Sequence, residues 1–169
     1  MNPVLDTWNN ADVSEAVEGM LACCGAQRWA SQMAALRPIA NVATLSEEAD
    51  RVWAAMSESD WLEAFACHPR IGERKSPSAL ERSSAWSRQE QSGASRASND
   101  VLHKLAEGNA LYEQRFGFTY IVCATGKSAD EMLAILERRL VNGRMAELKE
   151  AAEQQRQIMQ LRLGKWLLS

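Results

Sequence analysis

His68 is the side chain whose type and position most clearly permit acid–base chemistry in this sequence. Pro69 follows it, and a proline disfavours the α-helical conformation at the preceding residue, so His68 should lie at the carboxyl end of a helix over 60–67. The negative end of a helix dipole favours the imidazolium ion, which donates a proton near neutral pH. Position alone leaves a second interpretation open and favours it: the imidazole caps the last carbonyls of the helix.

A second group of polar side chains lies on one face of a predicted helix over 85–97. Ser87, Glu90 and Gln91 stand at i, i+3 and i+4, so their polar groups emerge together. An ordinary solvated helix surface has the same pattern, and periodicity alone favours that interpretation. Arg162 lies within an apolar stretch, where a guanidinium either reaches water or meets an anion, and the local sequence leaves both alternatives open.

Three other patterns have simpler explanations than chemistry. Residues 124–128 resemble the end of a phosphate-binding loop, but that loop needs a glycine five positions before Gly126, and Ile121 stands there. The two histidines and four cysteines contain no pair at metal-ligand spacing, so we expect buried thiols and no metal site. Arg138 and Arg139 end a predicted helix, where cations offset the helix dipole, and this local role accounts for both.

The elements that must position these side chains are predominantly helical. Apolar residues recur at helical spacing through most of the chain, and the expected fold is an all-α, single-domain bundle of about seven to eight helices over residues 1–169. The predicted helices cover 13–24, 27–36, 44–56, 60–67, 85–97, 99–116, 128–141 and 144–163. The expected N-caps are Asp12, Thr44 in a Thr44–Glu47 capping box, Ser57 or Ser59, and Ser128 in a Ser128–Glu131 capping box.

Two stretches interrupt the helical pattern. Residues 70–83 contain Gly72 and Pro77 and are predicted to form a loop; whether it closes as a lid is left open. Residues 118–124 lie between Gly117 and Gly126, are too few for a helix, and are rich in β-branched and aromatic side chains. We therefore expect a short, buried, extended segment there.

Composition limits the partners that the protein can have. The 19 Lys and Arg residues against 22 Asp and Glu residues give a net charge of −3, which provides no cationic field for nucleic acid or an anionic membrane. No apolar run is long enough to span a bilayer, the N-terminus lacks a signal-peptide pattern, and the cysteines lack CxxC spacing. These features predict a cytoplasmic protein.

Four short motifs occur in a distinctive order: His68-Pro-Arg-Ile-Gly72, then Ser87–Ala94, then Arg115–Phe118 leading into 120–124, and Leu161-Arg-Leu163 near the end. From about Trp29 to the C-terminus the sequence resembles the 2-oxo-4-hydroxy-4-carboxy-5-ureidoimidazoline (OHCU) decarboxylases of urate breakdown. The resemblance implies an all-helical domain, commonly a homodimer, that makes (S)-allantoin and carbon dioxide without metal or organic cofactor. The sequence departs from the family near 24–28, where a Ser-Pro pair often precedes the tryptophan.

The resemblance also implies roles for individual residues. His68 becomes the essential acid, and Glu90 contacts the hydroxyl-bearing carbon region of the substrate. The residues implied to hold the substrate are Pro69, Ser87, Gln91, Arg162 and the backbone of Tyr120, Ile121, Val122, Cys123 and Ala124. The alternative function is a non-catalytic helical module that docks a partner in a groove. A hydrolase of ureido compounds is disfavoured, because the sequence has neither a metal cluster nor an activated Ser or Cys pair.

Overall fold

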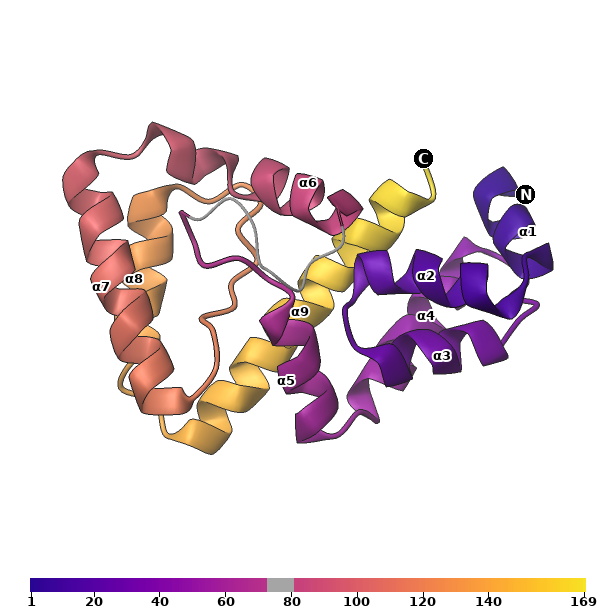
Figure 1. Ribbon diagram of the computed structural model, residues 1–169, viewed down its shortest axis with the longest axis horizontal. Coiled ribbons are helices and arrows are strands. Elements are labelled where there is room, and N and C mark those ends of the chain that lie inside the picture. Colours follow the sequence, from indigo (N-terminus) through magenta and orange to yellow (C-terminus); the bar gives the residue numbers. More distant parts are fainter. Residues whose placement is uncertain (73–80) are drawn as a thin grey trace. The chain divides into compact units, whose positions relative to one another are not determined.

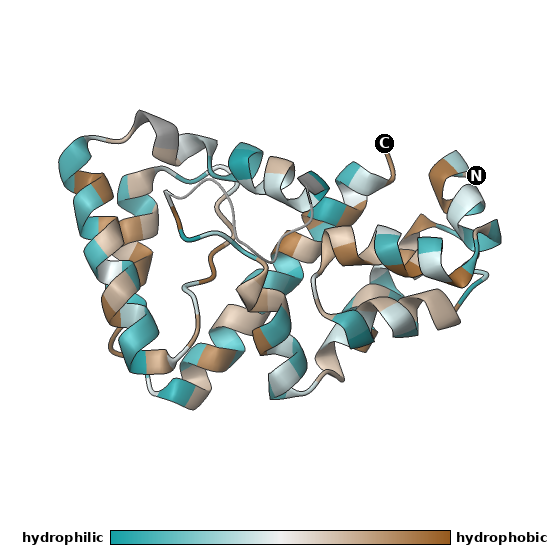
Figure 2. Ribbon diagram, viewed as in Figure 1, coloured by the Kyte–Doolittle hydropathy of each residue, from teal (hydrophilic) through white to brown (hydrophobic). Residues whose placement is uncertain are grey.

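The computed structural model describes residues 1–72 and 81–169, and within these ranges the chain is all-α, as predicted (Figure 1). Most helices carry both hydrophilic and hydrophobic residues (Figure 2), as expected when one face packs inward. The elements are α1 (Pro3–Asn10), α2 (Val13–Cys23), α3 (Gln27–Ala35), α4 (Val42–Ala54), α5 (Glu58–Ala66), α6 (Glu81–Glu90), the 3₁₀ helix η1 (Ser92–Arg96), α7 (Asn99–Phe116), α8 (Ala129–Arg139) and α9 (Arg144–Trp166).

The described part of the chain contains nine α-helices and η1, against the seven to eight helices predicted, because α1 is not among those that the sequence pattern predicts. The single helix predicted over 85–97 is wrong: α6 ends at Glu90, and η1 follows it as a separate 3₁₀ helix. Asn2 caps this helix by accepting hydrogen bonds from the backbone N–H groups of Val4 and Leu5, and Pro3 occupies its first position. Eight residues are too few for a clear apolar period, so the cap was the only strong signal. The predicted loop over 70–83 is wrong at its end, where α6 begins at Glu81, and its residues 73–80, with Pro77, lie outside the described part.

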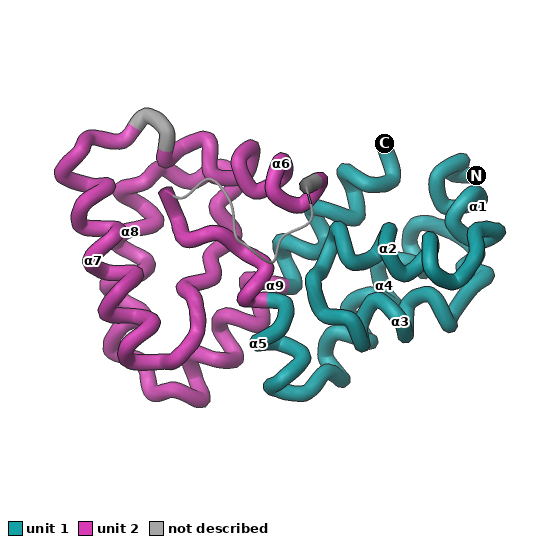
Figure 3. The backbone as a smooth tube through the Cα atoms, viewed as in Figure 1, with its two compact units in different colours: residues 1–64, 156–169 teal, residues 65–155 magenta. Residues whose placement is uncertain are grey.

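The chain divides into two compact units (Figure 3). Unit 1 contains residues 1–64 and 156–169, and unit 2 contains residues 65–155. The boundaries fall within α5 and α9, so each of these helices contributes to both units. That residues 1–169 form a single domain stays a prediction.

Unit 1 is held together by buried tryptophans on its helices. The indole Nε1–H of Trp8 on α1 donates to the carbonyl of Ala16 at 2.9 Å, and that of Trp29 on α3 donates to Ala49 on α4 at 3.1 Å. Helices α2 and α3 pack against each other. Trp166 of α9 meets Trp8 edge to face, with ring centroids 5.9 Å apart. The burial of Ala16, Met20, Trp29 and Met33 confirms the apolar faces expected for α2 and α3, apart from Val13 and Leu36, which are exposed.

Most predicted N-caps are confirmed, and one is wrong. The Asp12 side chain accepts from the backbone N–H of Glu15, and Ser128 and Glu131 form a complete capping box. The Thr44 prediction fails because α4 begins earlier: Asn41 is the N-cap, and its side chain accepts from the backbone N–H of Thr44 at 2.9 Å. Asparagine is at least as good an N-cap as threonine, so the helix begins after Asn41, which comes first in the chain.

Ser57 caps α5, one of the two alternatives predicted. Its hydroxyl accepts from the Asp60 backbone N–H at 3.3 Å, and the Asp60 carboxylate accepts from the Ser57 N–H at 2.9 Å. The pKa of Asp60 is lowered, chiefly by that backbone hydrogen bond from Ser57 and then by the Ser57 hydroxyl. The reciprocal bonds fix where α5 starts and therefore where its other end delivers His68.

Unit 2 is organised by α7 and α8, which lie side by side (Figure 1). Helix α7 ends at Gly117 in the left-handed conformation, with φ of 80°, and Gly126 turns the chain into α8 with φ of 78°. Between them, residues 119–124 form no helix or strand. Phe118 and residues 120–124 are all buried, which confirms the short extended segment.

Candidate functional site

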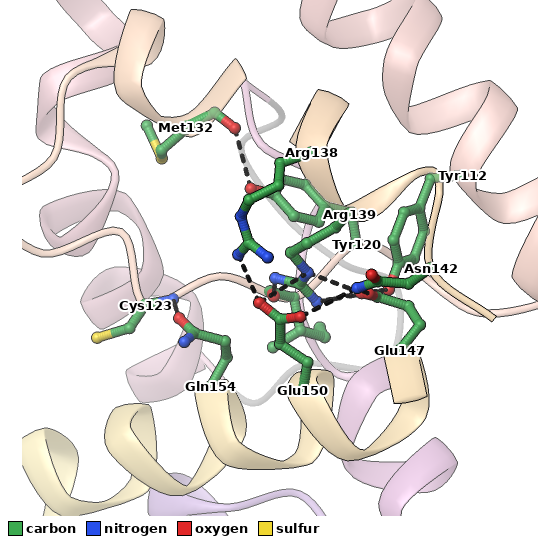
Figure 4. A network of polar contacts seen from close by, with 11 residues as sticks. Tyr112, Tyr120, Cys123, Met132, Arg138, Arg139, Asn142, Glu147, Glu150 and Gln154 are labelled. Carbon is green, nitrogen blue, oxygen red and sulfur yellow. Dashed lines mark hydrogen bonds and ion pairs between the residues drawn. The ribbon is translucent and has the colours of Figure 1, made fainter. Parts of the chain in front are cut away.

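The backbone of the extended segment is held by side chains from α8 and α9 (Figure 4) and by one from the turn before α8. The Ile121 carbonyl accepts from Arg139 Nη1 at 2.6 Å. The Cys123 N–H donates to Gln154 Oε1 at 2.8 Å, and the Cys123 carbonyl accepts from Lys127 Nζ at 2.7 Å. Residues 119–124 belong to no β-sheet, so their buried peptide groups have no neighbouring strand to bind. Hydrogen bonds from side chains take that place and fix the segment.

Arg139 is the centre of a buried cluster of charged and phenolic groups (Figure 4). Its side chain is 0% exposed, and its Nε donates to Glu147 Oε1 at 2.7 Å. The Tyr112 hydroxyl donates to the same carboxylate oxygen, and Asn142 Nδ2 donates to the other one at 3.0 Å. The guanidinium also lies 5.0 Å from the ring centroid of Tyr120.

The helix-dipole interpretation is therefore wrong for Arg139. Arg138 points outward, 60% exposed, and pairs with Glu150 at 2.6 Å. On α8 the buried residues Met132, Leu136 and Arg139 follow one another at i, i+4 and i+7, so Arg139 continues the apolar face. The sequence did contain a signal for this role, because Arg139 continues the apolar face of α8. A cation on a buried face needs a buried anion as its partner.

Both tyrosines of the cluster stay neutral hydrogen-bond donors. Burial raises the pKa of Tyr112, and its hydrogen bond to Glu147 raises it further. Burial likewise raises the pKa of Tyr120, whose hydroxyl donates to the Met132 carbonyl at 2.9 Å. The cluster thus fixes α7, α8, α9 and the extended segment to one another without a titrating phenol.

His68 lies two residues after Ala66, the last residue of α5, close to the predicted helix end, and is partly exposed. Its ring Nε2 lies 2.7 Å from Oε1 of Gln155, a side chain of α9 that is 0% exposed. The bond from Nε2 therefore goes to a side chain of another helix rather than to a carbonyl of α5. Pro69 beside it is buried.

The polar face of α6 is buried rather than solvated. Ser87 is 2% exposed and Glu90 9% exposed, so the interpretation of these residues as ordinary surface is wrong. Gln91, the first residue after α6, accepts a hydrogen bond at its Oε1 from the Gly72 N–H at 3.0 Å. This bond ties the end of α6 to the segment that begins with His68.

Gly93 provides a further close approach. A Cβ atom at this position would lie 2.2 Å from the Lys127 carbonyl oxygen, so only glycine lets η1 approach the turn that precedes α8. Lys127 in turn binds the Cys123 carbonyl. The motif Ser87–Ala94 is therefore connected through Gly93 and Lys127 to the extended segment.

Within unit 2 the structure brings together the segments that three of the four motifs identified. One chain of contacts runs from His68 through Gln155 to the adjacent Gln154 and on to Cys123. Another runs from Gly72 through Gln91 and Gly93 to Lys127. Both chains of contacts lead to Cys123, so they form one frame that links the segment of His68, the end of α6, which carries Glu90, and residues 120–124. Arg162 belongs to unit 1, where it is 3% exposed, and its part in the site stays a prediction.

A cavity of about 390 Å³ lies beside this frame, between residues 70–72 and α7. Arg70 and Glu113, which line it, form a bidentate ion pair at 2.6 and 2.8 Å. Its lining takes in the second half of the His68 motif and not His68 itself.

Two functional candidates were missed from the sequence: Gln154 and Gln155. On α9 the buried residues Leu148, Ala151, Ala152 and Gln155 follow one another at i, i+3, i+4 and i+7, so a glutamine occupies the apolar face. A buried amide requires partners, and that is the signal that would have found it. In residues 1–72 and 81–169 no three His, Cys, Asp or Glu side chains gather as a metal site requires, and no helix there is long and apolar enough to cross a membrane.

Comparison with known proteins gives a consistent result. Residues 9–164 match the family model described as OHCU decarboxylase. The chain is 39% identical over 144 residues to the uric acid degradation bifunctional protein TTL of Arabidopsis thaliana; the match covers 85% of this chain and 44% of that protein. It is 28% identical over 140 residues to a 2-oxo-4-hydroxy-4-carboxy-5-ureidoimidazoline decarboxylase of Haloferax volcanii, covering 80% of this chain and 79% of that one.

A solved structure has the same fold. The crystal structure of an OHCU decarboxylase in the presence of (S)-allantoin superposes with a TM-score of 0.76 at 34% identity, covering 88% of this chain and 96% of that chain.

Proposed function

Because the chain belongs to the OHCU decarboxylase family, we propose that it is a carboxy-lyase that converts OHCU into (S)-allantoin and carbon dioxide without a cofactor. The observation that supports this most directly is the frame in unit 2. It holds an imidazole, His68, by a buried amide and connects it to the segments that carry Glu90 and residues 120–124. An acid, a buried carboxylate and a rigid polar backbone are the groups that decarboxylation with stereospecific protonation requires.

The substrate supplies the electron sink for the reaction. Breaking the bond between C4 and the carboxylate releases carbon dioxide, and the electron pair forms a C4–C5 double bond while the electrons of the adjacent C5=N bond move to nitrogen, which takes up a proton. The protein then has two tasks: to hold the carboxylate out of the ring plane, so that the breaking bond aligns with the adjacent C=N bond, and to deliver a proton to one face. Protonation of C5, the ureido-bearing carbon, by the His68 imidazolium, with loss of the C4 hydroxyl proton to leave a carbonyl at C4, gives a single enantiomer.

The remaining residues are proposed to orient the substrate. Glu90 accepts a hydrogen bond from the substrate hydroxyl and so determines which face meets His68. Gln91 uses its Oε1 for Gly72, so its amide N–H₂ is the end that donates to the substrate. The Cys123 N–H is committed to Gln154, and other peptide groups of residues 120–124 are proposed to contact the ring.

Three further residues complete the proposed set. Ser87, buried on α6, offers a hydroxyl, and Pro69 provides an apolar wall beside His68. Arg162 is proposed to pair with the departing carboxylate through its guanidinium fork.

We also propose that the protein works as a homodimer in the cytoplasm and has no nucleic-acid or membrane partner. The family resemblance supports the dimer, and the net charge of −3 supports the absence of polyanionic partners. Light scattering coupled to gel filtration tests the dimer: a mass close to the 18.8 kDa of one chain contradicts it, and twice that mass supports it.

The decisive experiment generates OHCU from urate in the cuvette and follows circular dichroism after the protein is added. Spontaneous decay yields racemic allantoin without a dichroic signal. The proposal requires a dichroic signal of (S)-allantoin that appears faster than spontaneous decay and scales with protein concentration. Decay at the spontaneous rate to a racemic product contradicts it and favours the alternative of a partner-binding module.

A further inference from the structure

Gln155 is buried on α9 and forms a hydrogen bond that neither local structure nor helix packing requires. Its carbonyl oxygen lies 2.7 Å from His68 Nε2, while its amide nitrogen has no hydrogen-bond partner within the described residues. A buried donor without a partner destabilises the folded state, so an apolar side chain at this position would serve packing better. A costly polar group that touches the proposed acid is expected to serve the reaction.

Chemistry determines the direction of the bond. An amide oxygen carries no hydrogen and can only accept, so a hydrogen bond to it requires a proton on His68 Nε2. That proton is present in the imidazolium ion and in one of the two neutral tautomers. The bond therefore stabilises both of these forms against the tautomer that is protonated on Nδ1.

The position of Gln155 makes this bond rigid. Its side chain is 0% exposed and continues the buried face of α9 after Ala151 and Ala152. The preceding residue, Gln154, holds the Cys123 N–H at 2.8 Å. One turn of α9 therefore fixes both the orientation of the imidazole and the backbone of the extended segment, so the two cannot shift independently.

We propose that Gln155 is a positioning residue that keeps Nε2 of His68 protonated throughout the reaction, so that the proton delivered to the substrate comes from Nδ1. This inference rests on the proposed decarboxylation for its kinetic consequence. In that step the bond to the carboxylate breaks, carbon dioxide leaves, and the electron pair remaining on the ring takes the Nδ1 proton of the imidazolium. His68 is left as the neutral Nε2–H tautomer, and solvent returns a proton to Nδ1.

The tautomer can be observed without substrate, because the chain has only two histidines. ¹⁵N spectra of the labelled protein distinguish Nε2–H from Nδ1–H rings, and His103, whose side chain is 73% exposed, is identified by the variant His103→Gln. The neutral ring of His68 in the wild-type protein is expected to be the Nε2–H tautomer. An Nδ1–H ring overturns the proposal, because the amide would then be donating to Nε2.

Two substitutions test the dependence on Gln155. Gln155→Leu removes the acceptor and is expected to shift the neutral ring toward a tautomer mixture and to lower kcat about 10- to 100-fold, with little change in KM. It also removes the unpartnered donor, so its Tm should equal or exceed that of the wild type. Gln155→Glu keeps an acceptor oxygen in place and is expected to restore the Nε2–H tautomer and part of kcat.

Gln160→Leu is the matched control on the same helix. Gln160 Nε2 donates to the Ser46 carbonyl at 2.9 Å and to Asp50 at 2.7 Å, so its loss should lower Tm and leave the His68 tautomer unchanged. An unchanged tautomer and kcat in Gln155→Leu overturn the proposal. If the wild-type ring is Nε2–H and depends on Gln155 while (S)-allantoin formation is absent, the positioning role stands and the decarboxylase function fails. Should Gln155→Leu not fold, the wild-type spectrum and Gln155→Glu still decide the matter.

Discussion

Two regions of unit 2 bury polar side chains in opposite ways. In the Arg139 cluster the charges are matched: the guanidinium binds Glu147 and the Ile121 carbonyl, and Glu147 also accepts from Tyr112 and Asn142. At the His68–Gln155 pair the acceptor of the amide is used and its donor is left without a partner in the described part of the chain. A network in which each polar group has a hydrogen-bond partner stabilises the fold. A network with an unpartnered donor is less stable but keeps a group that can bind a ligand.

Both regions act on the same backbone. Arg139 holds the carbonyl of Ile121, and Gln154, next to Gln155, holds the N–H of Cys123. The comparison therefore predicts a separation of effects. Changes in the cluster should alter stability first, and changes around His68 should alter turnover first.

Substitution of the proposed catalytic pair should give the largest effect. His68→Ala and Glu90→Ala are each expected to lower kcat for (S)-allantoin formation by about 10²–10⁴-fold, the usual range for loss of acid–base catalysis. Far-ultraviolet circular dichroism should show unchanged helical content. Turnover close to that of the wild type in either variant would refute the role assigned to that residue.

Removal of the central cation should give the largest loss of stability. Arg139→Met leaves Glu147 buried without its counter-charge, and we expect the free energy of unfolding in urea to fall by about 3–5 kcal/mol. The double variant Arg139→Met/Glu147→Met removes both charges and should recover part of that loss. Equal stability of Arg139→Met and the wild type contradicts the cluster's structural role.

Gly93→Ala should affect stability and turnover together, because it lies on the contact that joins η1 to the extended segment. The added methyl meets a backbone oxygen, and relieving the overlap is expected to destabilise the protein by about 1–3 kcal/mol. Gly108→Ala is the matched control: its Cβ would meet the end of the Leu136 side chain, which can rotate, and alanine favours a helix. The Tm of Gly93→Ala should lie below that of Gly108→Ala, and the reverse order argues against the close approach.

Substitution of Glu150, at the partly exposed edge of the Arg139 cluster, should have the smallest effect on stability, and that effect should depend on pH. Partial burial opposes ionisation of Glu150, but the hydrogen bond from Arg138 and the charge of Arg139 outweigh it, so its pKa lies below the ordinary value. A carboxyl whose folded-state pKa is lowered stabilises the protein above its unfolded pKa, and the contribution disappears as pH falls through the folded-state pKa.

Glu150→Gln should therefore lower Tm slightly at pH 7, by an amount equivalent to about 1 kcal/mol or less, and should converge with the wild type in acid. The measurement is a pair of thermal melts at pH 7 and pH 3. A difference in Tm that grows in acid would show that Glu150 stabilises the fold by something other than its charge.

The sequence alone was sufficient for features that depend on neighbours within a few turns. Among the described residues, helical spacing identified each α-helix except α1, although it joined α6 and η1 into one helix over 85–97. The cap at Asp12 and the capping box at Ser128 follow from side chains three residues away, and Gly117 and Gly126 bounded the extended segment. His68 at the end of α5 follows from Pro69. These are local properties, because the backbone hydrogen bonds that they satisfy lie within one turn.

Only the tertiary structure decided which polar residues meet. Arg139 and Glu147 each lie in a locally ordinary helix, and Gln155 differs from a surface glutamine only by the face it occupies. Periodicity shows that such a residue points inward, but the identity of its partner depends on how helices distant in sequence pack. Arg139 therefore had a local explanation until α9 supplied its anion, and His68 had a local explanation until α9 supplied its acceptor.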